Sequence, residues 1–193
     1  MHQMRVFARI VINIVLRLFF KVEVINREKV PAEGPVIFCA NHNSILDMFF
    51  LGFRLDRWIY WMAKEELFKN PVLRFVIRKL GAFPVKRGKG DVGSIKYAYK
   101  LLENNKIVGI FPHGTRIKPE KIETTRIKPG AAMIAASTGV PVYGSYRIFS
   151  RMKVIYGDPF VVKKRDEKPT REELTEISMD IMKRVYSLSE VGA

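Results

Sequence analysis

Short apolar runs alternate with segments of helical length along this chain. Residues 36–40 and 107–111 are continuous apolar runs without a charge, as is typical of strands that are covered on both faces of a sheet. The segments between and after them carry apolar residues at helical spacing, and the last begins with a capping box at Thr170 and Glu173. Strands that alternate with helices predict an α/β domain with a mixed, largely parallel sheet flanked by helices.

Other elements follow from the same patterns. A mostly apolar helix is predicted from residue 46 to 55, after the turn that carries Asn43 and Ser44. Asn70 and Pro71 begin a second helix with an apolar face. Residues 152–156 and 160–162 predict a closing hairpin, because the residues between them, Gly157, Asp158 and Pro159, are typical of turns.

The first 21 residues differ from the rest in composition. Almost every residue from 6 to 20 is apolar, and a polar residue recurs every fourth position at Arg5, Arg9, Asn13, Arg17 and Lys21. The uninterrupted apolar stretches are far shorter than the roughly 20 residues that cross a bilayer. We therefore expect residues 1–21 to form an amphipathic helix at the membrane surface, with its basic residues on lipid headgroups, and residues 22–193 to form one domain. The alternative is a helix that packs on its own domain.

The chain is strongly basic. Its 34 Lys and Arg against 19 Asp and Glu give a net charge of +15, so we expect an anionic partner. A nucleic acid is disfavoured, because the aromatic residues lie in apolar runs and are not interleaved with basic ones. An anionic membrane surface, a phosphorylated small molecule and an acidic carrier protein remain. The one cysteine, Cys39, falls in a predicted buried strand, so no disulfide framework or thiolate metal cluster is expected.

His42 and Asp47 follow the first apolar run and are separated by four residues. On one continuous helix, residues five apart lie roughly 140° apart around the axis. The two side chains can therefore meet only if His42 lies on a turn and Asp47 lies in the first turn of the helix that follows. A carboxylate on one ring nitrogen leaves the other free to take a proton from a hydroxyl. The alternative is that His42 caps a turn and Asp47 stabilises a helix N-terminus.

Two further turns follow predicted strands and carry cationic or reactive residues. These residues are Lys86, Arg87, His113, Gly114, Thr115 and Arg116. Ligands of α/β proteins bind at the carboxyl ends of strands, so we expect both turns to line one crevice with His42. Arg87 and Arg116 suit bidentate contact with a phosphate, and Thr115 with backbone N–H groups near Gly114 could complete that site.

Four blocks of the sequence carry a resemblance to a known family. They are N-H-x-x-x-x-D at residues 41–47, G-A-F-P-V-K-R at 81–87, F-P-H-G-T-R at 111–116 and G-V-P-V at 139–142. In this order they resemble the blocks of the glycerolipid acyltransferases, of the 1-acyl-glycerol-3-phosphate acyltransferase (lysophosphatidic acid acyltransferase) type. A single H-x-x-x-x-D recurs by chance, whereas four ordered blocks across about residues 22–162 are specific.

The resemblance implies an activity and roles for the residues in the blocks. The family transfers a fatty acyl group from acyl carrier protein or coenzyme A to the free hydroxyl of 1-acyl-glycerol-3-phosphate, which gives phosphatidic acid. It implies that His42 is the general base, that Asp47 orients it and that Pro141 shapes the pocket. The implied substrate-binding residues are Lys86, Arg87, His113, Gly114, Thr115 and Arg116. No cofactor and no metal are expected, and we expect a peripheral or monotopic protein on the cytoplasmic face of the cell membrane.

Two residues depart from the family's pattern. The family has a glutamate where His113 stands, and a second proline is common where this chain has Gly144. Because either change bears on the acceptor, acyl transfer to another lysolipid is the first alternative. A metal-dependent hydrolase that uses His42, Asp47 and His113 as ligands is a less favoured one. A non-catalytic basic protein would explain the charge but not the position of His42.

Overall fold

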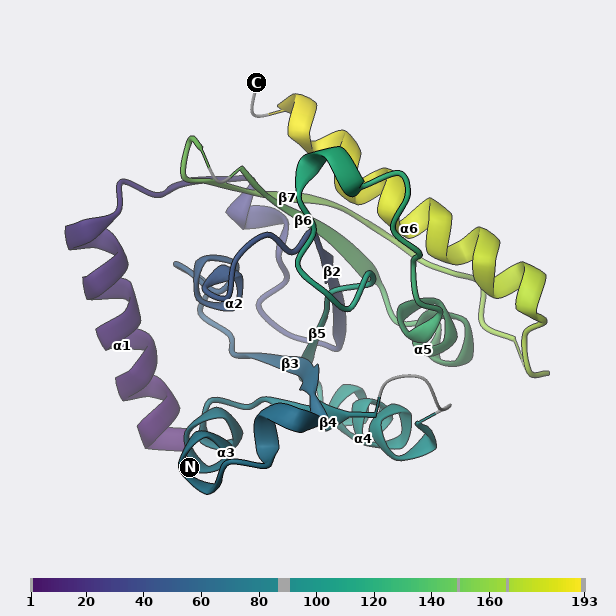
Figure 1. The fold of residues 1–193 in the computed structure, drawn as a ribbon, viewed down its shortest axis with the longest axis horizontal. Coiled ribbons are helices and arrows are strands. Elements are labelled where there is room, and N and C mark those ends of the chain that lie inside the picture. The colour runs from purple at the N-terminus through teal and green to yellow at the C-terminus, as the bar shows by residue number, and fades with distance from the viewer. Residues whose placement is uncertain (1, 87–90, 149, 166, 192–193) are drawn as a thin grey trace.

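Within residues 2–86, 91–148, 150–165 and 167–191, which the computed structural model describes, seven strands form one sheet in the order β1-β7-β6-β2-β5-β3-β4 (Figure 1). The strands are β1 (Glu23–Ile25), β2 (Val36–Ala40), β3 (Ile59–Lys64), β4 (Phe83–Val85), β5 (Ile107–Ile110), β6 (Val142–Ile148) and β7 (Lys153–Phe160). Neighbouring strands are parallel except β6 and β7, which are antiparallel. The predicted α/β class with a mixed, largely parallel sheet is confirmed.

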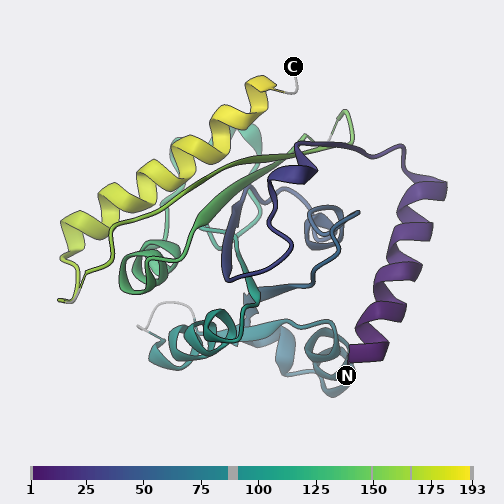
Figure 2. The same ribbon diagram turned by 180° about the vertical axis from the view of Figure 1, so that it is seen from behind.

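Helices cover both faces of this sheet. They are α1 (His2–Phe19), α2 (Asp47–Phe50), α3 (Pro71–Lys79), α4 (Val92–Glu103), α5 (Gly130–Thr138) and α6 (Arg171–Val191), with short 3-10 turns at Arg27–Lys29, Glu65–Phe68 and Pro119–Lys121. Helices α4, α5 and α6 lie on one face, and α1 and α2 lie on the other, as the view from behind in Figure 2 also shows. The predicted capping box begins α6, since the Glu173 N–H donates to the Thr170 hydroxyl at 3.2 Å and the Thr170 N–H donates to the Glu173 carboxylate at 2.8 Å.

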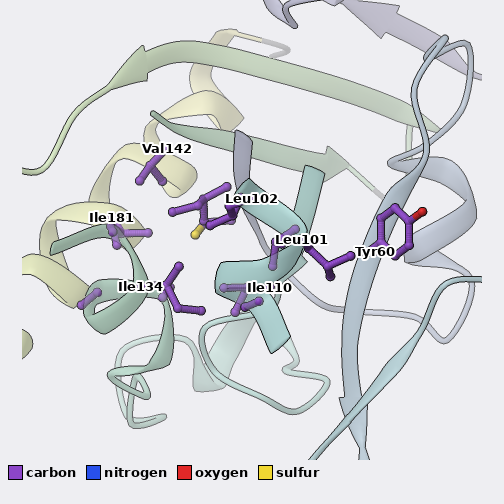
Figure 3. Packing of buried hydrophobic residues seen from close by; sticks show 14 of the residues in the cluster. Tyr60, Leu101, Leu102, Ile110, Ile134, Val142 and Ile181 are labelled. Atoms are coloured by element: carbon purple, nitrogen blue, oxygen red, sulfur yellow. The ribbon is translucent and has the colours of Figure 1, made fainter. Parts of the chain in front are cut away.

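The hydrophobic core has one part on each face, because side chains of a strand alternate between faces. In β2, Ile37 and Cys39 join the cluster under α4, α5 and α6, to which Leu101, Ile134 and Ile181 also belong (Figure 3). The other β2 side chains, Val36, Phe38 and Ala40, join the cluster that packs under α2. A strand buried on both faces explains the continuous apolar run in the sequence.

Two local predictions were wrong. The helix predicted from residue 46 to 55 is the single turn α2, and the residues after it form turns, with Arg54 in the left-handed region at φ 60°. The hairpin predicted across Gly157 to Pro159 is one continuous strand, β7, which pairs with β6. Gly157 serves a close approach, since a Cβ there would lie 3.2 Å from Leu188 of α6.

The first helix packs on the domain through its polar stripe. The Arg5 guanidinium donates to the carbonyl of Lys79 at 3.2 Å and to the Tyr60 hydroxyl, and Arg9 donates to the carbonyl of Asp56. Leu16 is buried on the same side, in the cluster under α2. Arg5 and Arg9 thus contact the protein, whereas Arg17 is exposed together with a set of apolar side chains: Met4, Phe7, Ile10, Val11, Ile14, Val15, Leu18 and Phe19. In the described part of the chain, no helix has the length and hydropathy that a bilayer span requires.

Helix α3 also leaves its apolar side chains exposed. It begins as predicted, with the Leu73 N–H donating to the Asn70 side chain at 3.0 Å and Pro71 in the first turn. Val72 and Phe75, however, are 74% and 63% exposed. The start of α1 lies against the end of α3, through the bond from Arg5 to Lys79 (Figure 1). Two neighbouring helices therefore present apolar side chains to the outside.

Candidate active site

The turn after β2 brings His42 and Asp47 together. Asp47 is the first residue of α2, and its carboxylate reaches back so that Oδ2 lies 2.9 Å from Nδ1 of His42. The same oxygen accepts the backbone N–H groups of Asn43 and Ser44, each at 2.7 Å. The predicted contact is therefore present, with the histidine on the turn and the aspartate in the first helical turn.

The electrostatics of this turn keep Asp47 ionised. Burial raises the pKa of the Asp47 carboxyl, but the hydrogen bonds that it accepts from His42, from two backbone N–H groups and from a guanidinium leave that pKa below its ordinary value. An ionised carboxylate accepts the Nδ1–H of the imidazole, so Nε2 of His42 keeps its lone pair. The His42 side chain is 18% exposed and borders a cavity.

The imidazole of His42 is stacked on two aromatic rings in succession. The rings of His42 and Phe111 lie 4.0 Å apart and nearly parallel, and Phe111 stacks on Trp61 at 4.5 Å. Trp61 in turn lies flat because β5 has a glycine beside it: a Cβ on Gly109 would come within 2.4 Å of the indole ring. The absence of a side chain at Gly109 thus leaves room for the indole ring of Trp61, on which the rings of Phe111 and His42 stack in turn.

Gly109→Ala should destabilise the protein. The added methyl group cannot fit between Ile59 and Trp61 unless the indole moves, and overpacking of this kind costs about 1–3 kcal/mol. We expect a Tm several degrees lower in thermal denaturation followed by circular dichroism. Gly130→Ala is the matched control, because a Cβ there meets nothing within 4 Å. Equal Tm values for the two variants would show that the aromatic stack accommodates the methyl group without loss of stability.

The cavity beside His42 has a volume of about 600 Å³ and is apolar along much of its wall. Its apolar lining comes from Met48, Trp61, Met62, Ala63, Leu67, Val85, Ile95, Ile110, Phe111, Pro112, Ala131 and Met133. Its charged lining consists of Lys64, Lys86, Asp91, Arg126 and Lys128. The arrangement places a proton acceptor beside an apolar space that also contains four cations.

The substrate-binding residues predicted from the sequence are distributed around this cavity. Lys86 and Gly114 line it. Thr115 and Arg116 are exposed on the turn after β5. A hydrogen bond joins the end of this turn to the turn that carries His42, because the Ile117 N–H donates to the carbonyl of His42 at 2.8 Å. Arg87 lies outside the described residues.

His113 lies in a different place from the other residues of its block. Its side chain is buried, and Nε2 lies 3.0 Å from the hydroxyl of Tyr186 in α6. Burial lowers the pKa of His113, and its Nδ1 has no hydrogen-bond partner among the described residues. The imidazole is packed between the turn and α6, and it does not line the cavity beside His42.

Three cations of the cavity were missed from the sequence, namely Lys64 at the end of β3, and Arg126 and Lys128 between β5 and α5. Lys128 lies against the turn after β5, since its Nζ is 3.1 Å from the position that a Cβ on Gly114 would take. A signal was available: β5 ends and α5 begins at one edge of the sheet, so the residues just before α5 must return to that edge.

Comparisons with known proteins show the family to which this chain belongs. The family model described as Acyltransferase matches residues 21–146. The 1-acyl-sn-glycerol-3-phosphate acyltransferase of Bacillus subtilis is 33% identical over 188 residues, which cover 92% of each chain. This chain belongs to the acyltransferase family. The resemblance seen in the four sequence blocks and the prediction of an acyltransferase enzyme are thereby confirmed.

Two other matches support the assignment of this chain to the acyltransferase family. The 1-acyl-sn-glycerol-3-phosphate acyltransferase of Streptococcus pneumoniae is 30% identical over 141 residues, which cover 72% of this chain and 48% of that protein. The crystal structure of the 1-acyl-sn-glycerophosphate acyltransferase PlsC of Thermotoga maritima matches with a TM-score of 0.69 and 25% identity. That match covers 100% of this chain and 83% of the other.

The alternative of a metal site finds no ligand set in this acyltransferase. Among the residues that the structure describes, no group of three His, Cys, Asp or Glu side chains is placed to hold a metal ion. His113, the third ligand that this alternative requires, faces Tyr186.

Proposed function

We propose that the protein transfers a fatty acyl group from an acyl thioester to the free hydroxyl of 1-acyl-glycerol-3-phosphate, which gives phosphatidic acid. The observation that carries this proposal is the His42–Asp47 pair, with His42 bordering a largely apolar cavity that is also lined by cations. The names of the relatives from Bacillus subtilis and Streptococcus pneumoniae support the choice of acceptor.

In the proposed reaction, His42 acts as the general base. Its Nε2 takes the proton of the acceptor hydroxyl while that oxygen attacks the thioester carbonyl. The tetrahedral intermediate then collapses, the carbon–sulfur bond breaks, and the imidazolium returns its proton to the leaving thiolate. The ionised Asp47 stabilises the imidazolium that forms between the two steps. The products are an ester and a free thiol, of acyl carrier protein or coenzyme A.

The cavity supplies groups for both parts of the acceptor. Lys86, Arg126 and Lys128 line it, and they would pair with the phosphate together with Arg116 and Thr115 at the adjoining turn and with Arg87 after β4. The apolar wall suits acyl chains. A phosphate at the cationic side would leave the glycerol hydroxyl free to approach His42.

The two departures from the family's pattern lie away from this cavity. His113 packs against Tyr186, and a Cβ on Gly144 would lie 3.5 Å from Val185 and Leu188. Both residues therefore face α6, and both changes affect how the sheet fits that helix. This placement supports an unchanged acceptor.

The proposal is tested by product identification. Purified protein is incubated with acyl carrier protein and coenzyme A thioesters of labelled fatty acids and with a panel of lysophospholipids, and products are identified by mass. We expect phosphatidic acid from 1-acyl-glycerol-3-phosphate and little product from 1-acylglycerol, which lacks the phosphate. Transfer to a different lysolipid would overturn the acceptor, and no transfer to any acceptor would overturn the reaction.

We also propose that the enzyme binds an anionic membrane surface, on the cytoplasmic face, through the exposed apolar side chains of α1 and α3. A lysolipid acceptor resides in the bilayer, so the enzyme must reach it there. Apolar side chains such as Phe7 and Leu18, which are 67% and 73% exposed, would enter the acyl-chain region. The net charge of +15 would add attraction to anionic headgroups.

The double variant Phe7→Asp, Leu18→Asp should bind anionic vesicles at least about 10-fold more weakly, because each substitution replaces a membrane-inserted side chain with a charge. Co-sedimentation with vesicles of phosphatidylglycerol measures the bound fraction. Met179→Asp on α6 is the matched control, since Met179 is apolar and 52% exposed on another helix. Undiminished binding of the double variant would exclude α1 as the anchor.

A further inference from the structure

A side-chain clamp joins the end of β6 to the catalytic turn. Ala40 of β2 pairs with Ser145 of β6, so the residue after Ala40 lies next to the last residues of β6. Asn41 bridges them in both directions: its Oδ1 accepts the N–H of Arg147 at 2.8 Å, and its Nδ2 donates to the carbonyl of Arg147 at 3.0 Å. The backbone of Arg147 is thereby fixed relative to the turn that carries His42.

The guanidinium of Arg147 lies on the catalytic carboxylate. Its Nη1 donates to Oδ1 of Asp47, and the two side chains are only 2% and 1% exposed. The guanidinium carbon also lies 3.9 Å from the centre of the Phe50 ring, so an aromatic face supports the cation. Arg147 is two positions beyond Ser145 and just beyond residues 21–146, the segment that the family model matches.

The two oxygens of Asp47 thus have separate partners. Oδ1 is held by Arg147, and Oδ2 faces His42 and the two N–H groups of its own turn. Rotation of the carboxylate plane out of this orientation would break both sets of bonds. We propose that Arg147 is a positioning residue for acyl transfer, which holds Asp47 by one oxygen so that the other stays on Nδ1 of His42. This inference rests on the proposed function and deepens it.

The charge of Arg147 has a second effect. A buried carboxylate without a cation tends to take up a proton, and a protonated Asp47 would no longer stabilise the imidazolium of His42. With Arg147 present, the buried pair carries no net charge. Among the described residues, the charged groups that border the cavity beside His42 are Lys64, Lys86, Asp91, Arg126 and Lys128.

Arg147→Met tests the inference, because methionine keeps much of the side-chain volume and removes the charge. We expect kcat to fall about 10- to 100-fold, with KM for both substrates within about two-fold, since only the orientation of the base changes. The acid limb of the pH–rate profile should move to higher pH, because loss of a cation favours protonation of the buried Asp47 carboxylate. Arg147→Lys should recover part of the rate.

A double-variant cycle keeps the test valid if Arg147→Met folds poorly. In an Asp47→Asn background, the further change Arg147→Met should lower kcat less than about two-fold, because both residues act through one carboxylate. This double variant leaves no unpaired buried charge. Arg57→Met is the control: Arg57 also has a partly buried guanidinium, which donates to the carbonyls of Pro31 and Asn105.

The outcomes separate this inference from the proposed function. Absence of acyl transfer in the wild-type enzyme would overturn the function itself. An active wild type with equal losses from Arg147→Met in both backgrounds, or with an unchanged acid limb, would overturn the role of Arg147 alone. A pH–rate profile for Arg57→Met that shifts as that of Arg147→Met does would also overturn it.

Discussion

Replacement of His42 by glutamine should lower kcat for acyl transfer by about 10²- to 10⁴-fold. Glutamine can keep a hydrogen bond to Asp47, but it has no nitrogen that takes a proton from the acceptor hydroxyl. The KM for each substrate should change little, because the cationic and apolar walls of the cavity are unaffected. Steady-state kinetics with a coenzyme A thioester and 1-acyl-glycerol-3-phosphate measure both quantities.

The pH dependence of the wild-type enzyme provides the companion measurement. Only a neutral imidazole can act as the base, so the rate should fall as the pH is lowered and His42 takes up a proton. Thr175→Ala on α6 is a suitable control variant, because the Thr175 hydroxyl donates to the carbonyl of Arg171 within its own helix and Thr175 does not line the cavity. A rate that stays flat down to about pH 5, or a His42→Gln enzyme of near normal activity, would remove His42 from the role of base.

Removal of single cations at the cavity should impair use of the acceptor by about 10- to 100-fold in kcat/KM. Lys128→Ala, Arg126→Ala and Arg116→Ala each delete a charged hydrogen-bond donor for the phosphate, and such bonds contribute about 1.5–3 kcal/mol. The KM for the acyl thioester should stay within about three-fold. The measurement is a matrix of kcat and KM values in which each substrate is varied at a saturating level of the other.

Lys183→Ala is the matched control for these variants, since Lys183 is an exposed cation on α6. It should leave both substrates unaffected. Equal losses for acceptor and thioester in the cavity variants would contradict a phosphate site. The comparison also ranks Arg116, which the sequence blocks suggest, against Arg126 and Lys128, which the cavity geometry suggests.

Much of the fold follows from local patterns in the sequence. The runs at β2 and β5 are buried on both faces, and such strands have a continuous apolar sequence that is easy to recognise. The placement of His42 on the turn and of Asp47 in the first helical turn also follows from local geometry, because that placement is the one in which two residues five apart can meet. Both predictions depend on short segments whose physics is independent of the rest of the chain.

The features that were missed depend on distant parts of the chain. Arg147 meets Asp47 because β6 pairs with β2, a contact across 100 residues that no local pattern shows. Gly157 to Pro159 has turn chemistry, yet pairing with β6 keeps it extended. The apolar residues of α3 suggest a covered face, but Phe75 is 63% exposed and has the ammonium group of Lys79 over its ring. In each case tertiary contacts override the local signal.

The residues proposed for proton transfer and the walls of the cavity proposed to hold the lipid come from different parts of this protein. His42 and Asp47 are held by their own turn and by β6, whereas the far walls of the cavity come from α4 and α5, through residues such as Ile95 and Met133. Substitutions of Ile95 or Met133 can therefore enlarge or narrow the space for a lipid tail while the base keeps its alignment. The same chemistry can accordingly serve lipids of different sizes by exchange of a few side chains on two helices.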